Sequence, residues 1–290
     1  GATPVIRGDA VFVSAMDKQK KTWAVCLGVE NGTVHWKKQI GDGFTNAQGN
    51  NAASPSPVTD GKAVYFLYGT GDLAGFSMEG EQLWKRSITE KHGKFEILWD
   101  YGSSPLLYRG RLYIIVLHGH HRNTKQDKSY ILCVDPETGK DIWKRWRHTG
   151  AVYESKQAYT TPFPWKTSRG TELVITGGDH LSGHDPSTGA LIWESETYNT
   201  SRIRYYRTVV SPVCAQGIFL VAAPRGGKLY ALKPDNTAGQ KQQGWTWTRR
   251  GNSPDVCTPL VYDNKFFVLD GLSKKLLCID PPTGTVLGEC

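Results

Sequence analysis

The sequence lacks the features that mark several common protein classes. No run approaches the roughly 18 apolar residues that a membrane-spanning helix needs, and the opening GATPVIRGDA lacks the basic start and apolar core of a signal peptide. The formal net charge is +8, but the basic residues are scattered and form no long Lys/Arg block. We therefore expect no membrane span and no nucleic-acid partner.

Cysteine and metal patterns are also sparse. Six cysteines in 290 residues are too few for a disulfide-built scaffold, and no CxxC or CxxCH occurs to indicate a zinc site, redox exchange or attached haem. The run HGHH at 118–121 is the sharpest metal candidate, because histidine is a common ligand for zinc and copper. It has no cysteine and only Asp127 nearby to complete a shell of about four ligands. We expect a solvated loop there and no metal site.

The residues that are abundant favour β-structure. Glycine is high at 32 residues and aromatics make 11% of the chain, while Val, Ile, Tyr, Phe and Trp cluster in short runs. No segment keeps the 3.6-residue period of a helix, so a helical solenoid is excluded. The composition predicts an all-β protein.

One phrase recurs along the chain. DPETGKDIW ends at Trp143 and DPSTGALIW ends at Trp193. Weaker copies are VENGTVHW to Trp36, MEGEQLW to Trp84, a stretched KPDNTAGQKQQGWTW to Trp247, and DPPTGTVLG from Asp280. A Ser or Thr followed by Pro and an apolar residue keeps the same interval, at Thr3, Ser56, Ser104, Thr161, Ser211 and Thr258. Two landmarks at one interval of about 45–60 residues indicate six repeats.

Each repeat is interpreted as four strands: a Pro-led strand, an apolar run, a strand that ends at the turn, and a Trp-ended strand. Four short strands in such a length are typical of a β-propeller blade. We therefore predict an all-β fold, a β-propeller of four-stranded antiparallel blades, as one domain over 1–290. The expected blades are approximately 1–40, 53–88, 101–147, 158–196, 208–249 and 255–290. The last copy has no Trp, so the number of blades in the ring remains open.

The repeated phrase has a structural explanation. Asp and Pro begin a turn, Gly supplies a positive φ, and Trp offers a large apolar face to the neighbouring blade. The residues expected to serve this docking are Asp135, Asp185, Gly139, Gly189, Trp36, Trp84, Trp143, Trp193 and Trp247. The small first position of the phrase holds Cys26, Cys133 and Cys278, which predicts buried thiols. Spacing leaves a Cys214–Cys257 bridge open.

The stretch Cys133-x-Asp135-x-x-Thr138-Gly139-x-x-x-Trp143 resembles the tryptophan-docking motif A-x-D-x-x-T-G-x-x-x-W of PQQ-type propellers. Copies of it cover the whole chain. Rings of PQQ-type propellers commonly hold seven or eight blades, so the resemblance leaves open whether the six repeats form a six-bladed ring or part of a seven- or eight-bladed one. That family includes PQQ-dependent alcohol dehydrogenases and the non-enzymatic BamB-like scaffold proteins of the bacterial envelope. The resemblance implies an extracytoplasmic location, in the periplasm or cell envelope.

Long, varied loops join the predicted blades, whereas the opposite turns are short, and binding residues concentrate on long loops held by a rigid frame. The candidate rim residues on the long-loop face are Asn51, Tyr101, Tyr159, Arg207, Asp255, His118, Asp179, His180 and Arg225. They suit a polar ligand such as a sugar, carboxylate or peptide, or else they only hydrogen-bond loop backbone. The run RIRYYR at 202–207 could stack bases or sugars, or only bridge two blades.

Two functions fit this fold. The resemblance implies that a quinoprotein dehydrogenase would bind PQQ with calcium, and its catalytic branch often has adjacent cysteines or a haem CxxCH, neither of which occurs here. Asp179 or Asp255 could act as the base, but no spacing selects either. We favour a non-catalytic, monomeric binding or scaffold module of the cell envelope. It would have no cofactor and no catalytic residue, and would bind a protein or small polar ligand on the long-loop face.

Overall fold

The computed structural model describes residues 2–45, 50–119, 128–235, 240–271 and 273–290. The chain divides into two compact units. The first comprises Gly1–Val116 with Ile131–Lys144, and the second comprises Leu117–Tyr130 with Arg145–Cys290. Among the described residues, no helix is long and apolar enough to cross a membrane.

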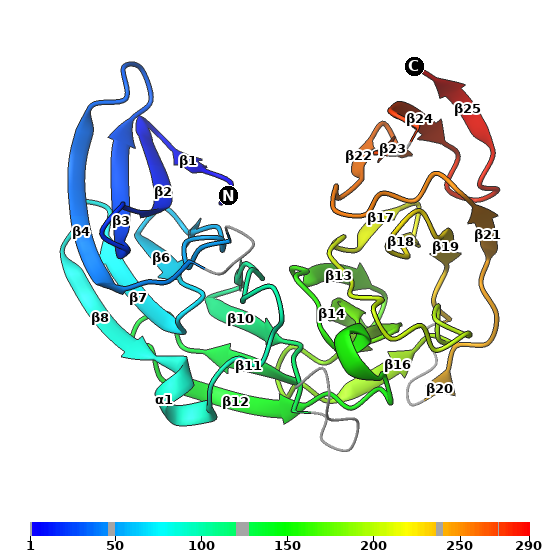
Figure 1. The fold of residues 1–290 in the computed structure, drawn as a ribbon, viewed down its shortest axis with the longest axis horizontal. Coiled ribbons are helices and arrows are strands. Elements are labelled where there is room, and N and C mark those ends of the chain that lie inside the picture. The colour runs from blue at the N-terminus through cyan, green and yellow to red at the C-terminus, as the bar shows by residue number, and fades with distance from the viewer. Residues whose placement is uncertain (1, 46–49, 120–127, 236–239, 272) are drawn as a thin grey trace. The chain divides into compact units, whose positions relative to one another are not determined.

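The first unit is built on three four-stranded sheets, and in each the strands follow one another in chain order (Figure 1). The first sheet holds β1 (Val5–Arg7), β2 (Ala10–Met16), β3 (Lys21–Gly28) and β4 (Val34–Asp42). The second holds β5 (Val58–Thr59), β6 (Ala63–Leu67), β7 (Asp72–Ser77) and β8 (Gln82–Ser87), which leads into helix α1 (Ile88–His92). The third holds β9 (Leu106–Tyr108), β10 (Arg111–Val116), β11 (Tyr130–Val134) and β12 (Asp141–Trp146).

The second unit also contains three sheets, preceded by the 3-10 helix η1 (Tyr153–Lys156). The first holds β13 (Phe163–Thr167), β14 (Gly170–Gly177), β15 (His180–His184), β16 (Leu191–Glu194) and β20 (Gln240–Lys241). The second holds β17 (Val213–Ala215), β18 (Ile218–Ala222), β19 (Lys228–Leu232) and β21 (Trp247–Arg250). The third holds β22 (Leu260–Tyr262), β23 (Lys265–Asp270), β24 (Lys275–Ile279) and β25 (Val286–Glu289).

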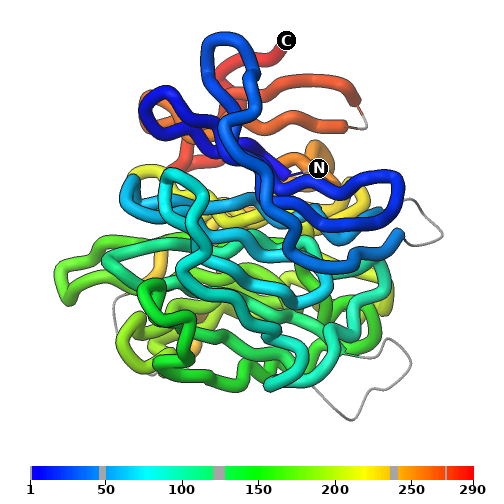
Figure 2. Tube along the Cα trace, turned by 90° about the vertical axis from the view of Figure 1, so that its left-hand side faces the viewer, coloured from blue at the N-terminus to red at the C-terminus, as the bar shows by residue number. Residues whose placement is uncertain are grey.

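The predicted pattern of four antiparallel strands per repeat is confirmed, with one addition. Gln240 and Lys241, inside the stretched fifth copy of the phrase, form β20 and pair in parallel with Trp193 and Glu194 of β16. The backbone N–H of Gln242 then donates to the Glu194 carbonyl at 2.8 Å. An outer edge strand carries backbone donors and acceptors that need partners, and here the insertion supplies them. Figure 2 shows the strands of the first two sheets of the first unit as neighbouring runs of the trace, coloured from blue to cyan.

The Ser/Thr-Pro landmark joins consecutive sheets near their first strands. Within each unit, the hydroxyl of one landmark accepts a hydrogen bond from the backbone N–H of the preceding landmark. The pairs are Thr3–Ser56 (2.8 Å) and Ser56–Ser104 (3.0 Å) in the first unit, and Thr161–Ser211 (3.0 Å) and Ser211–Thr258 (3.2 Å) in the second. The landmark therefore needs a hydroxyl as well as a proline.

Three of the outer-strand tryptophans reach the turn of the next repeat. Each indole N–H donates to a backbone carbonyl of that turn, and each ring covers the turn glycine so closely that a Cβ there would lie about 2.6–2.7 Å from it. These contacts are Trp36 with Met78 (2.9 Å) and Gly80, Trp84 with Pro136 (2.7 Å) and Gly139, and Trp247 with Pro281 (2.7 Å) and Gly284. The turn glycine thus serves both a positive φ and a close approach.

Trp193 makes a different contact. Its indole N–H donates to the carboxylate of Glu172 at 2.6 Å, within the same sheet, and its ring is fully buried. The ring also lies 6.4 Å from that of Phe219 in the next sheet. Trp143 lies in β12 with its ring 6.1 Å from Tyr113.

The Asp-Pro turns close as the repeated phrase predicts. The Asp135 carboxylate accepts the N–H of Glu137 at 2.8 Å, and Gly139, at φ 69°, donates to the Asp135 carbonyl. Asp185 and Gly189 repeat this geometry, with Gly189 at φ 72°. These aspartates therefore stabilise turns.

All six cysteines are free thiols, so Cys214 and Cys257 form no bridge. Cys26 and Cys133 are buried, as expected for the small first position of the phrase, whereas Cys278 is half-buried. Burial raises the pKa of the Cys133 thiol to about 12.

Candidate binding site

The long loops of the second unit are tied together by backbone hydrogen bonds. Ser155 N–H in η1 donates to the Arg204 carbonyl at 3.1 Å. Tyr159 N–H donates to the Thr208 carbonyl at 2.9 Å, and Thr208 N–H donates to the Gln157 carbonyl at 3.2 Å. The loop before β13 and the loop before β17 therefore lie side by side as one surface.

Asp179 supports this surface from inside. It is buried, at φ 67°, and its carboxylate accepts the Ser155 hydroxyl at 3.2 Å and the Asn199 amide at 3.1 Å. The same Asn199 amide holds the backbone of Ile203 through two further bonds, of 2.8 and 3.0 Å. Burial raises the pKa of Asp179 to about 7. Asp179 therefore connects η1 to the loop that follows β16.

Arg207 lies between two carboxylates. Its guanidinium is 3.7 Å from Glu154 and 3.5 Å from Asp255, and Asp255 also accepts the backbone N–H of Arg225 at 3.0 Å. Glu154 is buried, Arg207 and Asp255 are partly exposed, and Arg225 is exposed. The loops that precede β13, β17 and β22 thus contribute one charged side chain each, the loop that follows β18 contributes a backbone N–H, and charges of both signs reach the surface.

The two candidate histidines each have a ring nitrogen within hydrogen-bonding distance of a backbone carbonyl. His118 is buried, and its Nε2 lies 3.0 Å from the Lys128 carbonyl. His180 is half-buried, with Nδ1 2.8 Å from the Ser195 carbonyl, and burial lowers its pKa. His120, His121 and Asp127 lie outside the described residues. In the described ranges, no three His, Cys, Asp or Glu side chains cluster in a way that could hold a metal ion.

The candidate residues of the first unit also contact backbone. Tyr101 is buried, stacks on Phe95 at 4.4 Å, and donates its hydroxyl to the Ile115 carbonyl at 2.9 Å. Asn51 accepts the backbone N–H of Ala53 at 2.9 Å. Tyr159, in the second unit, is half-buried. Tyr101 therefore binds the backbone of β10, and Asn51 binds the backbone of its own loop.

The rim residues proposed from sequence leave out exposed apolar groups of the loops. In the interaction loop, defined here as Arg202–Arg207, Ile203 is 46% exposed and Tyr205 is 50% exposed. The guanidinium of Arg204 lies 3.9 Å above the ring of Tyr153, which holds it against η1. The Arg-Tyr alternation of RIRYYR marks this loop in the sequence. Which of its side chains are exposed depends on which loop packs beside it, and the sequence does not give that.

The chain is similar to a known protein family over nearly all of its length. A family model described as "Outer membrane protein assembly factor BamB" matches residues 1–129 and 127–289. No curated protein sequence matches the chain.

Three solved structures share its fold. BamB from Moraxella catarrhalis is 13% identical with a TM-score of 0.64, covering 100% of this chain and 72% of that one. A europium-containing methanol dehydrogenase is 12% identical with a TM-score of 0.73, covering 99% of this chain and 68% of that one. A quinohemoprotein alcohol dehydrogenase from Pseudomonas putida is 12% identical with a TM-score of 0.67, covering 99% and 58%. At these identities the likeness shows the fold alone, and it confirms the predicted β-propeller.

Proposed function

We propose that this chain, which belongs to the family of the outer membrane protein assembly factor BamB, is a non-catalytic propeller that binds a polypeptide partner in the cell envelope. The partner would contact the interaction loop (Arg202–Arg207) and the Asp255 carboxylate that flanks Arg207. The envelope location is part of the proposal and rests on the family description.

The observation that carries the proposal is the pairing of exposed apolar side chains with a charged border. Ile203 and Tyr205 are each about half exposed on a loop that Asp179 and Asn199 hold in place. Protein interfaces commonly place aromatic or aliphatic anchors at the centre and polar groups around them. Because the loop is fixed by hydrogen bonds, a partner would bind it without first having to order it.

The charges of the second unit fit a calcium-bound PQQ less well. Calcium takes six to eight oxygen ligands, and carboxylates are its main charged ones. Here Glu154 and Asp255 flank the Arg207 guanidinium, a fixed cation, and Asp179 is held by Ser155 and Asn199. The chain also lacks the adjacent cysteines that the catalytic branch often carries. The dehydrogenase therefore remains the second candidate.

A binding experiment tests the proposal. The immobilised chain is exposed to solubilised envelope proteins, and the double variant Ile203→Ser with Tyr205→Ala is run beside it. We expect a specific partner on the wild type, to be lost with the double variant and retained with Tyr262→Ala, which removes a side chain 70% exposed in β22. A partner that survives the double variant would refute this surface.

A second arm addresses the alternative. The purified chain is incubated with PQQ and Ca²⁺ and assayed for cofactor absorbance and dye-linked alcohol oxidation. Stoichiometric cofactor binding with turnover would establish the dehydrogenase and end the scaffold proposal.

A further inference from the structure

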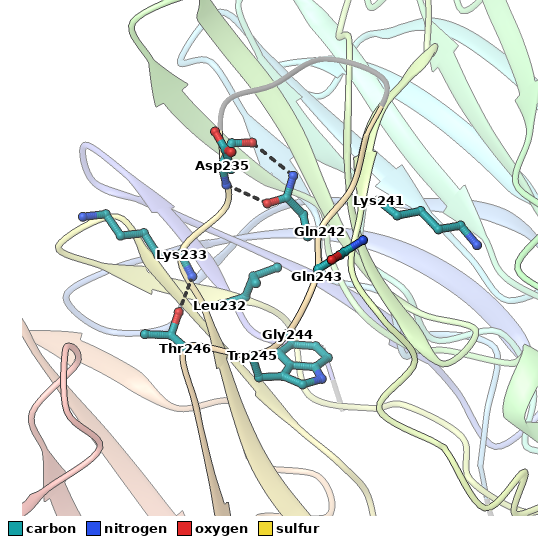
Figure 3. Close-up of a pocket in the computed structure, with 9 residues that line it drawn as sticks. All are labelled: Leu232, Lys233, Asp235, Lys241, Gln242, Gln243, Gly244, Trp245 and Thr246. Carbon is teal, nitrogen blue, oxygen red and sulfur yellow. Dashed lines mark hydrogen bonds between the residues drawn. The ribbon is translucent and has the colours of Figure 1, made fainter.

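A cavity of about 520 Å³ lies in the second unit, between residues 232–235 and 241–246, and Figure 3 shows these two segments on its sides. Its volume falls within the range of about 300–1,000 Å³ that small-molecule sites occupy. The cavity occurs where the fifth repeat departs from the others, because the stretched phrase places an insertion there. No residue that lines it belongs to the interaction loop.

Hydrogen bonds across the cavity hold its walls in place. The Gln242 amide is buried and pairs twice with the backbone of Asp235: its carbonyl oxygen accepts the N–H at 2.6 Å, and its nitrogen donates to the C=O at 3.1 Å (Figure 3). The Lys233 N–H donates to the Thr246 hydroxyl at 2.9 Å. A ligand would therefore meet a preformed site and would not have to order the two segments.

The indole of Trp245 forms one wall of the cavity and packs on a second aromatic ring. Trp245 is half-buried, and its ring lies 4.8 Å from that of Tyr230. The Tyr230 hydroxyl donates in turn to the Tyr198 carbonyl at 3.0 Å. The indole thus packs on a ring that is itself held by a hydrogen bond, while part of the indole surface stays accessible.

The remaining lining groups include both donors and acceptors. Asp235 brings a carboxylate, and Gln243 brings an amide that can do both, whereas the ammonium ends of Lys233 and Lys241 point outward to opposite sides (Figure 3). A phosphate would call for donors alone, and an apolar ligand would cost the polar groups their hydration. Sugar hydroxyls donate and accept, and the aliphatic face of a sugar ring packs on an indole.

We infer that this cavity binds a saccharide, with Trp245 as the stacking wall and Gln243 and Asp235 as hydrogen-bonding groups. The site is separate from the proposed partner surface. Failure of one proposal would therefore leave the other standing.

Saturation-transfer NMR on the full chain tests this inference, with glucose, N-acetylglucosamine and maltose as probes. We expect at least one sugar to bind with a dissociation constant of about 10 mM or tighter. Trp245→Ala should weaken that binding by about tenfold or more, in line with the loss of an aromatic contact. Trp146→Ala, which removes an indole 58% exposed in β12, should leave it unchanged.

A second variant guards against misfolding of Trp245→Ala. Gln243→Ala changes an exposed side chain and should also weaken binding, while sugar addition should shift the indole N–H resonance of Trp245 in the wild type. Failure of all three sugars to bind the wild type, or full binding by both variants, would overturn the inference.

Discussion

Two tryptophans of the second unit occupy the same place in the repeat and are used differently. Trp247 reaches the turn of the next repeat, donating to the Pro281 carbonyl at 2.7 Å over Gly284. Trp193 donates to Glu172 of its own sheet, and the strand that carries it is covered by β20. The difference coincides with the stretched turn that follows Trp193, so the turn of the next repeat decides how the tryptophan packs.

The largest expected effect is at Trp193. Trp193→Ala should lower the free energy of unfolding by about 3–5 kcal/mol, because it leaves a cavity and removes the N–H that satisfies the buried Glu172. Trp247→Ala removes a half-buried ring and should cost about 1.5–3 kcal/mol. Urea unfolding of both variants measures the difference. Equal losses would mean that the two packing modes contribute alike.

The pH dependence of the free energy of unfolding should be the next largest effect. Since the pKa of Asp179 is raised to about 7 from an unfolded value near 3.8, the folded protein binds more protons than the unfolded chain between these values. Stability should therefore fall as pH rises from 4 to 7, at up to about 1.4 kcal/mol per unit of pKa difference. The hydrogen bonds from Asn199 and Ser155, and then the cations of Arg202 and Arg147, lower the pKa of Asp179 and oppose this effect.

Asp179→Asn is the matched variant for that measurement. Unfolding free energies measured from pH 4 to 7 should depend less on pH in the variant than in the wild type. An unchanged slope would show that Asp179 does not titrate in this range.

Turn glycines allow a paired test in the first unit. Gly139 and Gly110 share a positive φ, of 69° and 68°, but a Cβ at Gly139 would lie 2.6 Å from the Trp84 ring, whereas nothing lies within 4 Å at Gly110. Gly110→Ala should cost about 1 kcal/mol of unfolding free energy from backbone strain. Gly139→Ala should cost about 1–3 kcal/mol more, from the clash. If thermal or urea unfolding gives the same cost at both sites, tryptophan packing on the turn is not the constraint.

The smallest effect is expected at the Ser/Thr landmark. Ser211→Ala removes the acceptor for the Thr161 N–H and should cost about 1 kcal/mol of unfolding free energy. Ser187→Ala, at an exposed turn position, serves as the control and should change stability by less than about 0.5 kcal/mol. Equal values would argue that the landmark hydroxyl contributes nothing between sheets.

The repeat, its strands and its turn glycines could be predicted because they depend on local patterns: alternation, turn chemistry and the interval between landmarks. The hydroxyl function of the Ser/Thr landmark could not, since it requires knowing which repeats lie side by side. The same holds for β20, whose partner Trp193 is distant in sequence. A stretched copy of a repeat shows that something is inserted and does not show where the insertion pairs.

The candidate rim residues show the same limit. Arg207, Asp255 and Arg225 were proposed from their places beside the strands, and they meet in the structure. Tyr101 and His118 come from equivalent places and are buried. Loop position predicts proximity to the rim, but burial depends on the length and packing of neighbouring loops.

Site-specific photo-crosslinking tests the proposed partner surface most directly. A photoreactive phenylalanine analogue replaces Tyr205 of the interaction loop in one variant and Tyr262 of β22 in another, and both are illuminated in envelope extracts. The account predicts a discrete protein adduct at position 205 and none at position 262, although Tyr262 is the more exposed. An adduct at 262 alone would contradict it.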